Sequence, residues 1–165
     1  MSTEQNIERH TIAVLVDNEA GVLARVVGLF SGRGYNIESL TVAEVDNAGH
    51  TSRITIVTSA TPMVIEQIKA QLERLVPVHK VVDLTSDAPG IEREMALVKV
   101  AGTGERRVEA LRLSDAFRAR VIDTTHTSFI FEVTGAPEKI EAFVGLMRPL
   151  GLVDVSRTGV VAIAR

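Results

Sequence analysis

Residues 17–23 carry the side chains best suited to binding a small charged molecule. They join a strand-like apolar run to a helical pattern, and the first turn of a helix presents unpaired N–H groups at the positive end of its dipole. Such a turn favours a carboxylate. Gly21 lets a ligand approach the backbone, and Asn18 offers both a donor and an acceptor, as an ammonium and a carboxylate together require. These residues alone favour a simpler interpretation, a turn capped by Asp17 or Asn18.

A second candidate segment is residues 33–37, which link the same helix to a strand expected at the open edge of a sheet. The simpler interpretation is again structural, a glycine at a helix end followed by a loop. If two chains pair, Asn36 and Ile37 of one chain can face the turn around Asn18 and Gly21 of the other.

The remaining residues show no pattern that is typical of a catalytic site. The chain has no cysteine, which excludes disulfides, thiolate metal sites and cysteine nucleophiles, and its four histidines have no metal-ligand spacing. No nucleophile elbow, phosphate loop or dinucleotide fingerprint occurs. The acidic residues fall in expected turns or on polar helix faces, where we expect them to be solvated: Asp17, Asp46, Asp83, Asp87, Glu66, Glu73, Glu138 and Glu141. The chain is therefore predicted to have no catalytic activity of its own and no metal site.

Composition narrows the class of protein further. The chain has 165 residues, 45% hydrophobic and 24% charged, which suits one large or two small globular domains. A net charge of −3 argues against a protein that coats nucleic acid, and an aromatic content of 4% argues against base stacking on a sheet. No apolar run is long enough to span a bilayer, and the polar residues 1–9 lack the apolar core of a signal peptide, so a cytoplasmic protein is expected.

The hydrophobic periodicity predicts two halves with the same order of elements, β-α-β-β-α-β. The first half reads as strands at 10–16, 37–45, 51–58 and 78–84, with helices starting at Val22 and at Pro62 behind the N-cap Thr61. Residues 86–90 resemble a linker, after which the pattern recurs from Glu94 to Ile163. This order predicts an α+β protein of two ferredoxin-like domains, residues 1–85 and 86–165. Each sheet is expected to have helices on one face and to need a partner for its open face and edges.

The same candidate segments carry a resemblance to a known family. Residues 18–42, with the run Gly34-Tyr35-Asn36-Ile37-Glu38-Ser39-Leu40, closely resemble the signature of the regulatory (small) subunits of acetolactate synthase, also called acetohydroxyacid synthase. The likeness continues in order through residues 52–56, 91–100, 117–123 and 157–160, so it covers nearly the whole chain.

This resemblance implies that residues 1–85 form an ACT domain, an amino-acid-sensing module that pairs side by side with a second copy. Valine would bind at that interface: Asn18, Gly21, Val22 and Leu23 of one chain would hold its amino and carboxylate groups, and Asn36 and Ile37 of the other would complete the pocket. Residues 86–165 would form the family's second ferredoxin-like, regulatory domain.

The resemblance also implies a partner, the large catalytic subunit, which would carry thiamine diphosphate, Mg²⁺ and FAD. That subunit condenses pyruvate with pyruvate or 2-oxobutyrate in branched-chain amino acid biosynthesis, and the small subunit activates it and confers feedback inhibition by valine. Ala24 stands where several family members carry serine. The lost hydroxyl is expected to alter ligand affinity, or to matter little if this side chain points at the sheet. ACT domains also serve other enzymes and repressors, although no helix-turn-helix candidate is present here.

Overall fold

The chain folds into two compact units, seen in a computed structural model that describes residues 6–165. The first unit runs through Ile91 and includes Val160–Arg165, and the second is Glu92–Gly159. Compared with the predicted domains, 1–85 and 86–165, the first unit also includes residues 86–91 and 160–165. Of the polar segment predicted at residues 1–9, positions 1–5 lie outside the described residues.

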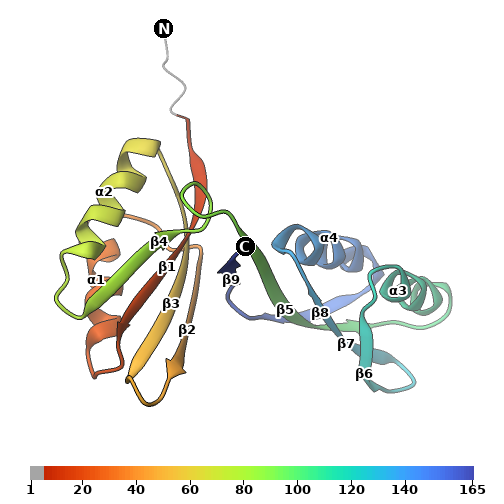
Figure 1. Cartoon of the computed structure of the whole chain (residues 1–165). Coiled ribbons are helices and arrows are strands. Elements are labelled where there is room, and N and C mark those ends of the chain that lie inside the picture. The colour runs from red at the N-terminus through yellow and green to blue at the C-terminus, as the bar shows by residue number, and fades with distance from the viewer. Residues whose placement is uncertain (1–5) are drawn as a thin grey trace, which may run out of the picture. The chain divides into compact units, whose positions relative to one another are not determined.

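The first unit has the predicted β-α-β-β-α-β order (Figure 1). Its sheet is antiparallel with strand order β2-β3-β1-β4, so β2 and β4 are the edges. The elements are β1 (Glu8–Asp17), α1 (Val22–Gly32), β2 (Ser39–Asp46), β3 (Thr51–Ala60), α2 (Pro62–Glu73) and β4 (Val78–Asp83).

Alternation along β1 and the helical spacing of α1 and α2 build the core of this unit. Every second residue of β1 faces the helices, and the apolar stripes of α1 and α2 meet them. Thr61 caps α2 as predicted, because its hydroxyl accepts from the Val64 N–H at 3.4 Å and Pro62 opens the helix. The fully buried core includes Ile12, Val14, Val26, Phe30, Ile54, Ile56, Ile65, Ile68 and Leu72.

The sheet face turned away from these helices is not fully open, contrary to the sequence expectation. The last strand, β9 (Val161–Ala164), returns to the first unit and packs on that face. Ala162 clusters there with Ala13 and Leu84, and all three are buried. Part of the surface that was expected to need another protein is therefore covered by the chain's own C-terminus.

The second unit repeats the order with sheet order β6-β7-β5-β8 (Figure 1), and β9 pairs with β5 off this path. Its core includes Val98, Phe131, Phe143 and Met147. A two-domain ferredoxin-like fold is thus confirmed. The elements are β5 (Gly90–Ala101), α3 (Glu105–Ala116), β6 (Arg120–Thr124), β7 (Ser128–Gly135), α4 (Pro137–Met147), a 3-10 turn (Arg148–Leu150) and β8 (Leu152–Arg157). No helix within residues 6–165 combines the length and apolarity needed to cross a membrane.

Candidate functional site

The turn between β1 and α1 presents an uncapped helix N-terminus. Gly21 is the N-cap residue, at φ 85° and ψ −8°, and no side chain hydrogen-bonds to the first turn. A Cβ at Gly21 would meet no atom within 4 Å. The positive φ, rather than crowding, is therefore what selects glycine here, and the space beside its Cα is open to a ligand.

Neither Asp17 nor Asn18 caps this helix, so the simpler interpretation of the turn is wrong. The Asp17 carboxylate lies 2.5 Å from Nε2 of His79 on β4, and the Asn18 side chain bonds to none of the described residues. The Val22 N–H reaches only the Glu19 carbonyl at 3.4 Å. Among residues 6–165, no acceptor receives the N–H groups of Leu23 and Ala24, so these donors are free for an external anion.

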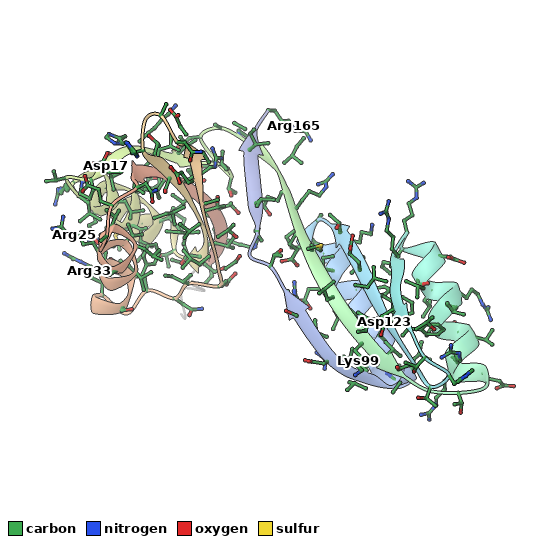
Figure 2. All side chains as sticks on the ribbon, turned by 90° about the horizontal axis from the view of Figure 1, so that it is seen from below. Asp17, Arg25, Arg33, Lys99, Asp123 and Arg165 are labelled. Carbon is green, nitrogen blue, oxygen red and sulfur yellow. The ribbon has the colours of Figure 1, made fainter. Side chains whose placement is uncertain are left out.

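The residues of this first turn differ in what they can offer a ligand. Val22 is 5% exposed and packs in the core, so only its backbone is accessible, whereas Leu23 is 40% exposed. Ala24 is also exposed, so its side chain does not point at the sheet. Figure 2 labels Arg25 and Arg33, which project outward near the two ends of α1. The serine-to-alanine difference therefore falls on the solvent side of the helix.

The second segment, residues 33–37, follows the other end of α1. Gly34 has φ 71°, and the Tyr35 N–H closes the helix end on the Phe30 carbonyl at 2.9 Å. Asn36 is exposed, and its carbonyl accepts from the Thr58 hydroxyl at 2.6 Å. Ile37 is half-buried against the core. The backbone of this segment is thus held by the fold, while the Asn36 side chain is available to a ligand.

One chain does not bring these two segments together. Gly21 precedes α1 and Asn36 follows it, and an 11-residue helix at 1.5 Å per residue separates its ends by about 16 Å. Two hollows, of about 320 Å³ beside β2 and β9 and about 730 Å³ beside α3, contain none of the six predicted site residues. A single pocket built from both segments therefore requires a second copy of the chain.

A buried polar cluster at Asp83 was missed by the sequence analysis. Asp83 was expected to be a solvated turn residue, but it is 0% exposed. Its carboxylate lies 2.8 Å from Nδ1 of His10, lies 3.5 Å from Nζ of Lys69, and accepts the N–H groups of Thr85 and Ser86 at 2.9 and 3.2 Å. No periodicity along β4 marks this residue as buried, because the strand reads Val-His-Lys-Val-Val-Asp with only Asp83 fully buried.

In this cluster, hydrogen bonds and charged neighbours shift each pKa in the direction opposite to burial, and their effect is the larger one. Burial raises the pKa of Asp83, but the N–H groups of Thr85 and Ser86 and the His10 ring bring its pKa below the ordinary value. Burial lowers the pKa of His10, but hydrogen bonds to Glu8 and Asp83 leave it raised. Hydrogen bonds to acidic neighbours likewise raise the pKa of Lys69. The cluster therefore joins β1, α2 and β4 through charged hydrogen bonds, and it is structural rather than catalytic. No group of three or more His, Asp or Glu within residues 6–165 could hold a metal ion.

Comparison with known proteins identifies the family. Residues 12–80 match a family model described as an AHAS small subunit-like ACT domain, and residues 93–165 match one described as the small subunit of acetolactate synthase. The chain belongs to the acetolactate synthase small subunit family. It is 46% identical to the acetolactate synthase small subunit of Aquifex aeolicus, over 96% of this chain and 82% of that protein.

Further relatives match nearly the whole chain. The small subunit of acetolactate synthase isozyme 3 of Escherichia coli is 44% identical, over 95% of this chain and 96% of the relative. The crystal structure of the small subunit from Thermotoga maritima superposes with a TM-score of 0.84 at 39% identity, covering 96% and 98% of the two chains. The matched ACT domain spans most of β1 to β4, which include the candidate turn of this small subunit.

Proposed function

We propose that this chain is the regulatory subunit of acetolactate synthase, which activates the large catalytic subunit and makes it sensitive to valine. The name small subunit, carried by its relatives, supports a larger catalytic partner. The observation that carries the valine proposal is the uncapped N-terminus of α1, with Gly21 open to solvent. In this proposal the large subunit binds thiamine diphosphate, Mg²⁺ and FAD, and the complex works in the cytoplasm.

Valine has the chemistry that this turn can hold. Its carboxylate would accept from the free N–H groups at the start of α1, where the helix dipole is positive. The carbonyl oxygen of the Asn18 side chain would accept from its ammonium group. The backbone of Gly21 and Val22 would border the ligand, and Leu23 would contribute exposed apolar surface.

A second copy of the chain would supply Asn36 and Ile37. This arrangement follows from the length of α1, which separates the two segments within one chain, and from the position of β2 at the edge of the sheet. Edge strands carry unpaired backbone groups that a second copy can satisfy. We expect the two paired copies to have two alternative relative placements. Valine bound between them would stabilise the placement that binds valine more tightly, and it would inhibit the catalytic subunit only if its affinity differs between the two placements.

Reconstitution with the large subunit tests this function. The small subunit is expected to raise the rate of acetolactate formation, and valine is expected to reduce that rate. Calorimetry on the small subunit alone should give valine binding that Asn36→Ala weakens about 10-fold or more, since a hydrogen bond to a charged group contributes about 1.5–3 kcal/mol.

Asn47→Ala is a matched control, because Asn47 lies in the exposed turn between β2 and β3, outside the proposed pocket. Wild-type affinity in Asn36→Ala would remove the second chain from the pocket. Valine binding with no effect on the large subunit would instead support a sensor that serves another enzyme or a repressor, the alternative that the sequence left open.

A further inference from the structure

The last six residues, Val160–Arg165, belong to the first unit although the chain reaches them only after completing the second unit. Their burial alternates: Val160 and Ala162 are 2% and 9% exposed, whereas Val161 and Ile163 are 52% and 65% exposed. One side of this strand therefore faces the sheet of the first unit and the other faces solvent.

Two hydrogen bonds tie this tail to β2 and β3. The Val160 N–H donates to the hydroxyl of Ser39 at 2.8 Å, and the Arg53 guanidinium donates to the Ala162 carbonyl at 2.7 Å. Arg53 lies opposite Ala43 in the β2–β3 pairing, so the tail is fastened beside the edge strand along much of its length.

Ser39 is the first residue of β2 and stands two positions after Ile37. The segment before it has few other backbone anchors: the Thr58 hydroxyl holds the Asn36 carbonyl, and the Glu38 N–H donates to the Val57 carbonyl at 2.8 Å. Among the strands of residues 6–165, the edge strand β2 pairs with β3 alone. The tail is thus an additional support at the point where the Asn36–Ile37 segment enters the sheet.

We propose that Ser39 and Val160–Arg165 are positioning residues for the Asn36–Ile37 half of the effector site. This inference rests on the proposed valine function and deepens it. The second unit ends at Gly159, and the next residue, Val160, hydrogen-bonds to Ser39 of β2, so the covalent chain connects that unit directly to the start of β2. Effector binding and docking of the tail then strengthen each other, since coupling between two equilibria is reciprocal.

The test compares three variants of the full small subunit, reconstituted with the large subunit. Ser39→Ala removes the acceptor for the Val160 N–H, and a chain ending at Gly159 removes the tail. Ser59→Ala is the matched control, because Ser59 is a half-buried strand residue of β3 for which no side-chain bond to the tail exists among the described residues. Valine titrations are normalised to each variant's own activity without valine, and hydrogen exchange of residues 39–46 is followed in the absence of valine.

Both Ser39→Ala and the shortened chain are expected to raise the half-inhibitory valine concentration about 5- to 10-fold and to speed exchange at the start of β2, while Ser59→Ala changes neither. A valine response within twofold of wild type in both variants overturns the proposal, even if exchange is faster, since the tail would then be only structural. If the wild-type protein binds no valine, the proposed function fails and this inference fails with it. If wild type and both variants respond alike, only this inference fails.

Discussion

Replacing Asp83 by alanine is expected to lower the free energy of unfolding of the first unit by about 3–4 kcal/mol. The carboxylate is 0% exposed, and its loss leaves the N–H groups of Thr85 and Ser86 without their acceptor and His10 and Lys69 without a shared anion. Two orphaned backbone donors cost about 1 kcal/mol each, and the lost charged partner accounts for the rest.

Asp83→Asn separates these two contributions. The amide oxygen can still accept from both N–H groups, so only the charged part is lost and a decrease of about 1–2 kcal/mol is expected. Asp87→Asn is the matched control: Asp87 also contacts Lys69, at 2.9 Å, but its side chain is 57% exposed, so we expect less than about 1 kcal/mol.

Tyrosine fluorescence during urea unfolding measures these effects on the first unit alone. Tyr35 is the only tyrosine, the chain has no tryptophan, and the Tyr35 ring packs edge-on against Phe30 with centroids 6.2 Å apart. With an m-value of about 2 kcal/mol/M, Asp83→Ala should lower the midpoint by about 1.5–2 M at a fixed protein concentration. A shift no larger than that of Asp87→Asn would refute the argument that burial makes this cluster stabilising.

Three further predictions concern Gly21, His10 and Thr41. Gly21→Asp should weaken valine binding at least 10-fold more than Gly21→Asn. Both variants replace glycine at φ 85°, but only aspartate places a negative charge beside the ligand carboxylate. Equal valine affinities of the two variants by calorimetry would show that the site lies elsewhere. The pKa of His10 is raised above 6.5, so the contribution of its charged form to stability is complete below about pH 6.5 and is lost as the pH rises through the pKa of the folded state. The urea midpoint of the wild type should therefore fall over that pH range. An equal fall in His10→Gln would contradict the assignment of this pH dependence to His10. Thr41 has a buried hydroxyl with no hydrogen-bond partner among residues 6–165. Thr41→Val should therefore leave the free energy of unfolding unchanged or raise it by about 1 kcal/mol. A clear decrease of the urea midpoint in the same assay would show that the hydroxyl is hydrogen-bonded in solution.

Local patterns in the sequence were sufficient for the order of elements. The alternation of apolar residues in β1, the helical spacing of Val22, Val26 and Phe30, and the Thr61-Pro62 start of α2 each depend on residues within one or two turns of chain. Such signals survive without knowledge of the rest of the fold. The run from Gly34 to Leu40 placed the chain in its family for the same reason, because it is contiguous.

The start of α1 shows where local reasoning reaches its limit. The sequence predicted both a ligand-binding turn and a simple cap by Asp17 or Asn18, and it favoured the cap. In the structure neither residue caps the helix, and the Asp17 carboxylate instead hydrogen-bonds to His79 on β4, a residue distant in sequence. The choice between the two interpretations depended on a neighbour that no spacing along the chain reveals.

The sequence by itself determined the two β-α-β-β-α-β halves and the family, and it supplied the prediction of which residues form the candidate site. Only the tertiary structure decided that Asp83 is buried, that β9 returns to the first unit, and that neither Asp17 nor Asn18 caps α1. The physical reason is the range of the forces involved. Periodicity reports which side of an element is apolar, but which surface covers that side is determined by contacts between segments far apart along the chain.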